Sequence, residues 1–203
     1  MLMGLLQSEH IMANRNSLTR LAVATVLMLP LSLTGATETV ANASSLPCQS
    51  DPGHTDFDFW VGDWTVTSTK DGTYLGRNKI TKEAAGCLLV EQWHGQGGAY
   101  GRSLNYYNPS RGVWRQLWVD NAGYSIDYEG GIEDGAMVLE GTFFFHADGR
   151  EVGFRGSWTP LEGGAVRQQF HVKKDDGSWS LNWDARYDRA DSTDAEDEVR
   201  VGD

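Results

Sequence analysis

Tryptophan and hydrogen-bonding side chains alternate with a two-residue period in several segments of this chain, a pattern that can build a ligand pocket. Because successive side chains of a strand point to opposite faces, Gln116 in VWRQLWVD shares a face with Trp114 and Trp118. Glu91 shares a face with Trp93 in LLVEQWHG. Flat apolar walls with a few hydrogen-bonding groups are the usual composition of a small-molecule site. The polar candidates are Glu91, Ser103, Asn105, Tyr107, Gln116 and Asp120, and the candidate walls are Trp64, Trp93, Trp114 and Trp118.

Arg167 is a further candidate for contact with a ligand. A guanidinium that points inward can bind a ligand carboxylate, or it can pair with Glu91 in the absence of a ligand. Buried polar groups must be hydrogen-bonded, so the candidate side chains could also bond to one another in a filled interior. The residues alone leave both the ligand pocket and the filled interior open.

Signals for catalysis and for metal binding are weak. The chain has no GxSxG motif, and its serines have no local histidine partner. Beyond residue 43, no two histidines have a short metal-ligand spacing and no HExxH motif occurs among His54, His94, His146 and His171. We therefore expect no resident metal or cofactor. Glu91 with Asp120 could act as the acid and base of a hydrolase or isomerase, which would require a raised carboxylate pKa.

Turn signals recur along the chain and predict an all-β protein. Clusters of Asp, Asn and Gly, which supply the positive φ of tight hairpins, separate segments rich in aromatic and β-branched residues. These segments are mostly about 8–12 residues long, a spacing typical of sandwiches and barrels. Neither face of the middle segments is purely apolar. We therefore predict an antiparallel up-and-down barrel of about ten strands over residues 57–189, which has no exposed edges and has room for one small ligand.

The stretch FDFWVGDW, from Phe57 to Trp64, begins this barrel. We predict that it forms the first strand and that its aromatic side chains close one end of the barrel. Gly62 would allow a bend or a close approach by a neighbouring side chain.

The N-terminus has the features of a secretory signal peptide. Arg15 and Arg20 precede the apolar run LAVATVLMLPLSL, and a small-residue site, ANA, ends at Ala43. The apolar run is shorter than the roughly 20 residues of a membrane-spanning helix. We therefore predict a signal peptide over residues 1–43, with Met12 as an alternative start and an uncleaved anchor as the alternative interpretation. The mature chain would be periplasmic or extracellular, with no stable membrane span.

Two cysteines follow the predicted signal peptide: Cys48 in a lead-in over residues 44–56, and Cys87. An exported chain meets an oxidising compartment, so we predict that they form a disulfide. The pair lacks the CxxC spacing of a metal site. In the chain-entropy model, closing a loop of about 40 residues is worth about 3–4 kcal/mol.

The net charge of −11 argues against a nucleic-acid partner, which would require a basic face. Part of that charge lies in residues 190–203, which carry many acids and few apolar side chains. This composition predicts a disordered acidic tail.

Several motifs of the chain resemble, in order, those of a family of small secreted bacterial proteins of unknown function. They are FDFWVGDWTV (57–66), GCLLVEQWHG (86–95), GRSLNYY (101–107), WRQLWVD (114–120), LEG (139–141), WTP (158–160), VRQ (166–168) and Tyr187. The resemblance covers Cys48 to Arg189 and implies a lipocalin-like, calycin-type β-barrel and an exported location, without a firmly known reaction. Phe170 and His171 stand where this family has Trp and Glu.

These patterns favour an exported barrel that binds a small, partly apolar molecule of unknown identity in its interior. The expected ligand contacts are Trp64, Glu91, Trp93, Asn105, Tyr107, Trp114, Gln116, Trp118 and Arg167. The alternatives are a hydrolase or isomerase with a carboxylate general base, and a filled barrel with a structural or interaction role.

Overall fold

Ten antiparallel strands make up most of the computed structural model, which describes residues 46–190. They are β1 (Gly62–Ser68), β2 (Tyr74–Glu83), β3 (Leu88–Gly95), β4 (Tyr100–Asn108), β5 (Val113–Asp120), β6 (Tyr124–Glu133), β7 (Ala136–Phe145), β8 (Arg150–Pro160), β9 (Val166–Lys173) and β10 (Trp179–Arg189). The predicted all-β fold of about ten strands is confirmed. The predicted signal peptide, the alternative start at Met12, residues 44–45 of the lead-in and residues 191–203 of the acidic tail lie outside the described residues.

Short helices precede the barrel and fill some of its turns. Within residues 46–190 they are the α-helix α1 (Pro47–Ser50) and the 3₁₀ helices Pro52–Thr55, Asp58–Trp60, Ala84–Gly86, Gln96–Gly98 and Glu162–Gly164. None of these helices has the length and hydropathy required to cross a membrane.

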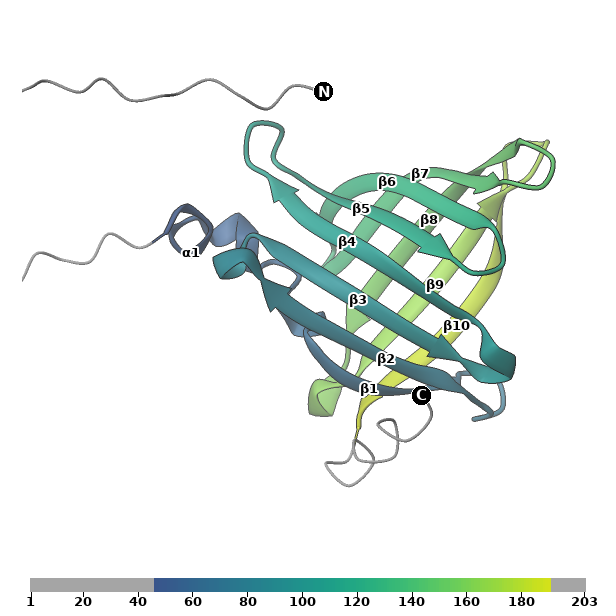
Figure 1. The fold of residues 1–203 in the computed structure, drawn as a ribbon, viewed down its shortest axis with the longest axis horizontal. Helices are drawn as coiled ribbons and strands as arrows, with labels where there is room; N and C mark the ends of the chain where they lie inside the picture. The colour runs from purple at the N-terminus through teal and green to yellow at the C-terminus, as the bar shows by residue number, and fades with distance from the viewer. Residues whose placement is uncertain (1–45, 191–203) are drawn as a thin grey trace, which may run out of the picture. The chain divides into compact units, whose positions relative to one another are not determined.

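The strands close into one barrel because β1 pairs with β2 on one side and with β10 on the other (Figure 1). Every other pairing joins strands that are consecutive in the sequence, which is the predicted up-and-down order. In the seam between β1 and β10, Trp64 pairs with Arg189 and Val66 with Tyr187. Closure leaves no exposed sheet edge, so no helix is needed to cover one.

The turn between β6 and β7 shows how the sequence specifies the hairpins. It consists of Asp134 and Gly135, whose φ angles are +48° and +82°. Positive φ at both central residues is characteristic of a type I′ turn, whose twist matches that of the flanking strands. The Asp-Gly signal therefore produces a two-residue hairpin at this position.

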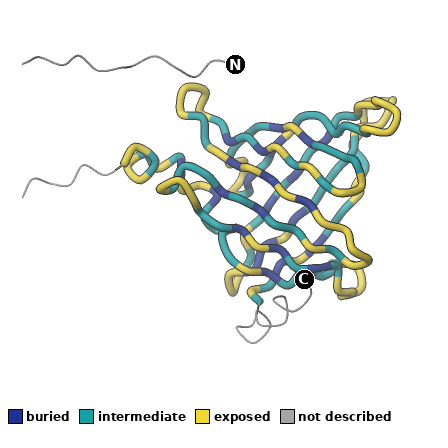
Figure 2. The backbone as a smooth tube through the Cα atoms, in the orientation of Figure 1, coloured by how far each residue is buried: buried dark blue, intermediate teal, exposed yellow. Residues whose placement is uncertain are grey.

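Side chains alternate between the inside and the outside of the barrel, as predicted for β3, β4 and β5. Along β4, Gly101, Ser103 and Asn105 are buried between exposed neighbours. Buried positions recur between intermediate and exposed ones along the strands (Figure 2). Glu91 in β3 and Gln116 in β5 are also buried, so the interior contains polar groups as well as aromatic rings.

The prediction that FDFWVGDW forms the first strand is wrong for its first five residues. Asp58–Trp60 is a 3₁₀ helix, and β1 begins only at Gly62. In an extended strand Phe57 and Trp60 would point to opposite faces, whereas residues three apart in a 3₁₀ helix lie on the same side. Both rings are fully buried and stack with centroids 4.9 Å apart. Local 3₁₀ geometry therefore allows both aromatic side chains to pack inward.

The prediction that these aromatics close one end of the barrel is confirmed. Phe57 also packs against Trp158 and Trp114, with ring centroids 5.2 and 5.6 Å away. At Gly62, where φ is +147°, an added Cβ would collide with the guanidinium of Arg189. The glycine thus permits the close approach of a neighbouring side chain that the sequence suggested. We call this end, with the aromatic side chains that fill it, the closed half of the barrel.

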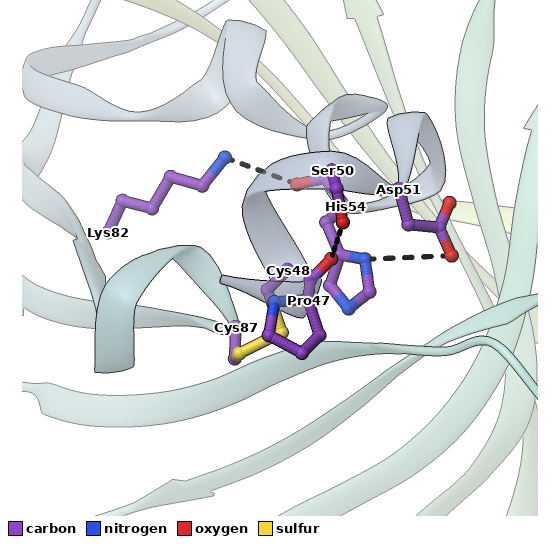
Figure 3. Close-up of a disulfide and its surroundings, with 7 residues drawn as sticks. All are labelled: Pro47, Cys48, Ser50, Asp51, His54, Lys82 and Cys87. Atoms are coloured by element: carbon purple, nitrogen blue, oxygen red, sulfur yellow. Dashed lines mark hydrogen bonds and ion pairs between the residues drawn. A yellow bond between two sulfur atoms is a disulfide. The ribbon is translucent and has the colours of Figure 1, made fainter. Parts of the chain in front are cut away.

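The predicted disulfide is present: Cys48 is bonded to Cys87, with their Cα atoms 5.1 Å apart (Figure 3). It joins α1 to the start of β3. Lys82 adds a second link, since its Nζ donates to the carbonyl of His54 at 3.2 Å and to the carboxylate of Asp58 at 2.6 and 2.7 Å. The lead-in is therefore fixed over the closed half by covalent and ionic contacts.

Candidate functional site

The other half of the barrel interior contains a cavity of about 400 Å³. It lies at the end where β3 and β5 finish and β6 and β10 begin, opposite the lead-in. Its aromatic walls are Trp93, Trp118, Phe143, Phe154, Phe170 and Trp183. A second hollow of about 470 Å³ adjoins it at the same end and shares Tyr124, Phe143, Phe154 and Asn182 with it. We call this half of the barrel the open half.

Hydrogen-bonding side chains form the floor of the cavity, where the open half meets the closed half. Those that line the cavity are Glu91, Gln116, Tyr128, Gln168 and Tyr187. Glu91 is only 4% exposed. Its Oε1 accepts a hydrogen bond from Asn78 at 2.7 Å and its Oε2 accepts one from Ser103 at 2.6 Å.

A chain of hydrogen bonds runs across β6, β5 and β4 and ends on Glu91 in β3. The hydroxyl of Tyr128 donates to Gln116, and the amide of Gln116 donates to Asn105. Asn105 donates in turn to the hydroxyl of Ser103 at 2.8 Å, and Ser103 donates to Glu91. Every donor in this chain points toward the carboxylate, so the chain favours a negative charge there.

Gln168 holds a second set of donors on the opposite wall. Its Oε1 accepts from the hydroxyl of Tyr187 at 2.6 Å and from the indole of Trp183 at 3.0 Å. Both tyrosine hydroxyls of the floor, on Tyr128 and Tyr187, thus use their single proton within the protein. Toward a ligand they can act only as hydrogen-bond acceptors.

Burial shifts the ionisation of this floor. It raises the pKa of Glu91 from 4.5 to about 7, against the opposing effect of the hydrogen bonds from Ser103 and Asn78. Burial and the nearby Glu91 charge also raise the pKa values of Tyr128 and Tyr187 well above their ordinary range. Near neutral pH, Glu91 is therefore close to half ionised while both phenols are neutral.

A β-bulge shapes the rim of the cavity. The pairing of β10 with β9 shifts register between Leu181 and Trp183, so Asn182 is the extra residue. Strict alternation predicted that Leu181 shares a face with Trp183, but Leu181 is exposed and Asn182 lines the cavity. An extra residue in one strand redirects the side chains beside it, which explains the difference.

The structure brings together four of the candidate ligand contacts: Glu91, Trp93, Gln116 and Trp118 line the cavity. The other interior candidates, Trp64, Ser103, Asn105, Tyr107 and Trp114, are not part of its lining. Trp114 donates to the carbonyl of Gly53 at 3.0 Å, and Trp64 donates to that of Trp60 at 2.9 Å. These side chains fill the closed half or, as Ser103 and Asn105 do, support the floor from beneath.

The expected inward placement of Arg167 is wrong. Its side chain is 44% exposed and donates to Asp184 at 2.8 and 2.6 Å, on the outside of the barrel. The adjacent Gln168 points inward instead and lines the cavity. The hydrogen bonds from Arg167 hold the pKa of the Asp184 carboxyl below its usual range.

Asp120 lies at the rim of the cavity rather than beside Glu91 on the floor. Its Oδ1 accepts from the backbone amides of Ala122 and Tyr124, both at 3.0 Å, and its Oδ2 accepts from Trp118 at 3.3 Å. Asp120 therefore organises the turn between β5 and β6. The structure places the two acids of the suggested catalytic pair at different depths of the barrel.

Several lining residues were not chosen as candidates from the sequence, among them Tyr128, Phe143, Phe154, Gln168, Phe170, Trp183 and Tyr187. Trp183 and Tyr187 each stand two positions from Ala185 on one face of β10, so alternation could have identified them. Gln168 lies on the face opposite Arg167, so choosing the other face of β9 would have identified it. Nothing local in the sequence indicates the depth at which each side chain lies in the barrel.

The histidines do not gather at the cavity. His54, which belongs to the lead-in, is buried at the closed half, where its ring lies 5.1 Å from that of Tyr107. His146 contacts Ser125 at 2.9 Å on the exposed surface. Within residues 46–190, no three His, Cys, Asp or Glu side chains lie close enough together to hold a metal ion.

No protein-family model matches this chain, and no curated protein matches it at a significant level. The resemblance to a family of small secreted bacterial proteins therefore stays a prediction.

Proposed function

We propose that this protein is an exported barrel that binds a small, partly apolar molecule in its open half. The observation that carries the proposal is the cavity of about 400 Å³, with aromatic walls and a hydrogen-bonded floor. Ligand pockets are commonly of this size and have this composition, with a few polar groups that fix the orientation of the ligand. A filled barrel would need a solid interior, which the cavity in the open half does not fit.

The arrangement of the interior supports one orientation of the ligand. Phe170 and Trp183 stack at 26° with centroids 6.4 Å apart, and Trp93 meets Trp183 edge to face at 6.0 Å. These rings present flat apolar surfaces to the cavity, while the polar groups lie below them. A ligand with a flat apolar body and one polar end would pack its body against the rings and place its polar end toward Glu91.

An exported location is part of the proposal. The disulfide between Cys48 and Cys87 supports it, since such bonds persist mainly in oxidising compartments. The predicted signal peptide and the resemblance to secreted proteins agree with this location.

Calorimetric titration with 2-naphthalenemethanol, a flat neutral probe with one polar end, tests the proposal. We expect the wild-type protein to bind this probe, and Trp118→Ala to weaken binding by about tenfold because an aromatic wall is lost. Trp179→Ala is the matched control: Trp179 lies on the outer face, 4.9 Å from the guanidinium of Arg155, so its loss should leave binding unchanged.

Native mass spectrometry of protein purified from the exported fraction provides a second readout. An extra mass that is lost on denaturation would give the size of the natural ligand. Wild-type protein that carries no extra mass and binds no naphthalenemethanol would contradict the proposal.

Acid–base catalysis by Glu91 is a second candidate function, favoured by its pKa of about 7 in a cavity. A group with a pKa near the working pH is suited to move protons. The test is to incubate the recovered ligand in deuterium oxide with wild-type protein and with Glu91→Gln. Deuterium incorporation that requires Glu91 would establish catalysis, and its absence with the wild-type protein would leave binding as the function.

A further inference from the structure

We propose that the ligand carries a protonated amine and that this group pairs with Glu91 at the floor of the cavity. This inference rests on the proposed function and specifies its ligand class. It is carried by the distribution of charge and of hydrogen-bond acceptors around the cavity.

The cavity lining contains acids and no base. Glu91 lies on the floor and Asp120 on the rim, and within the described residues no Lys, Arg or His side chain lines this cavity. Lys174 borders only the adjoining hollow, where it is exposed to solvent. Several strand arginines pair with acids on the outer face, as Arg167 does with Asp184 and Arg155 with Glu140. The protein therefore supplies no cation to the floor.

The hydrogen-bond directions on the floor also favour a donor on the ligand. Each oxygen of Glu91 accepts one hydrogen bond from the protein and can accept another. The hydroxyls of Tyr128 and Tyr187 already donate within the protein, so they too offer only lone pairs. An ammonium group has three donors and no acceptor, which matches this set.

A ligand that enters the cavity displaces water from around Glu91. A neutral apolar ligand would leave an ionised carboxylate without solvent or counter-ion, which is unfavourable in a medium of low polarity. An ammonium group removes this penalty by pairing with the carboxylate. The indole rings of Trp93, Trp118 and Trp183 line the cavity, and a cation placed over the face of such a ring gains further attraction.

Three probes that share one flat body test this inference: 2-naphthylmethylamine, 2-naphthalenemethanol and 2-naphthoate. They are titrated calorimetrically into the intact disulfide-bonded protein at about pH 8, where Glu91 is mostly ionised. Besides Glu91, the titratable side chains that line the cavity are Asp120, Tyr124, Tyr128 and Tyr187. We expect the amine to bind at least about tenfold more tightly than the alcohol, because a charge-assisted hydrogen bond is roughly twice as strong as a neutral one. The carboxylate probe should bind most weakly.

Glu91→Gln should abolish the preference for the amine over the alcohol, because the variant carries no negative charge to pair with an ammonium group. The variant can keep its hydrogen bonds, since the buried Oδ1 of Asn78 has no partner among the described residues and a turned Asn78 amide could accept from the new side chain. Glu162→Gln is the matched control, because it removes the same charge from an exposed residue after β8, at the closed end. It should leave all three affinities unchanged.

The outcomes separate the two proposals. If the alcohol binds as tightly as the amine to the wild-type protein, the proposed function stands and the amine inference is wrong. If the amine preference survives in Glu91→Gln, the assignment of Glu91 is wrong. If no probe binds to the wild-type protein, both proposals fail together. The comparison among probes on the wild-type protein needs no variant, so it remains decisive even if Glu91→Gln does not fold.

Discussion

Replacing Glu91 with glutamine should change how the stability of the fold depends on pH. Because burial raises the pKa of Glu91 from 4.5 to about 7, the folded state holds a proton in that interval that the unfolded chain has released. The free energy of unfolding falls as pH rises wherever the folded state binds more protons. The stability that the folded state retains while Glu91 is protonated is therefore fully present below pH 4.5. It declines as the pH rises from 4.5 and is lost above about pH 7.

The size of the effect follows from the same two values. Each pH unit between 4.5 and 7 changes the free energy of unfolding by about 1.4 kcal/mol, for a total of about 3 kcal/mol. Solvent screening should reduce this value little, since Glu91 is only 4% exposed. Glutamine does not ionise, so it lacks this pH dependence. From pH 4 to pH 8, the free energy of unfolding of Glu91→Gln should therefore rise by about 3 kcal/mol relative to that of the wild-type protein.

Urea unfolding at a series of pH values, followed by tryptophan fluorescence, measures this difference. Other groups also make stability depend on pH, so the informative quantity is the difference between the variant and the wild-type protein at each pH. Glu162→Gln, which removes a carboxylate from an exposed position, is the control and should run parallel to the wild-type protein. Parallel curves for Glu91→Gln as well would refute the interpretation of Glu91 as a buried acid with a raised pKa.

Three further changes test the fold and the cavity. Replacing Cys48 and Cys87 together with serine should lower the free energy of unfolding by about 4 kcal/mol, since the bond spans 39 residues; an unchanged urea midpoint would contradict this. An added Cβ at Gly101 would collide with the ring of Trp118, so Gly101→Val should destabilise the fold by about 1–3 kcal/mol and weaken binding of naphthalenemethanol, measured by urea unfolding and calorimetry. Arg167→Ala removes an exposed ion pair and should lower stability by about 1 kcal/mol or less; tighter binding of naphthylmethylamine in this variant would show that the guanidinium of Arg167 reaches the cavity after all.

The division of the barrel into two halves gives FDFWVGDW a physical role. Its aromatic rings, with Trp114 and Trp158, fill the closed half, and the disulfide and Lys82 hold the lead-in over that end. The polar floor rests on this packed base. Within residues 46–190, the cavity lies at the opposite end, from which a ligand of the proposed kind would enter.

Local patterns in the sequence determined the strands and much of the inside of the barrel. The two-residue period is a property of the extended backbone, so Glu91 could be assigned to the face of Trp93, and Gln116 to that of Trp118, from spacing alone. Turns such as Asp134–Gly135 are equally local, since positive φ is available to these residues without help from the rest of the chain.

Only the tertiary structure determined where the two-residue alternation of side chains fails. The bulge at Asn182 depends on how β10 pairs with β9, and the 3₁₀ helix at Asp58–Trp60 forms where Phe57 and Trp60 pack into the barrel. Arg167 is a different case, because its face of β9 is polar while the opposite face carries Val166, Phe170 and Val172, so the pattern of this strand already favoured an outward direction.

The sequence also could not predict the depth at which each side chain lies in the barrel. Glu91 and Asp120 share the interior, yet one lies on the floor and the other at the rim, because the register between neighbouring strands sets their height. The hydrogen-bond chain from Tyr128 to Glu91 joins residues of the four consecutive strands β3 to β6, and the register between these strands determines which of their side chains meet. Alternation within a strand determines which face a residue takes, but only closure of the barrel brings these faces together around one cavity.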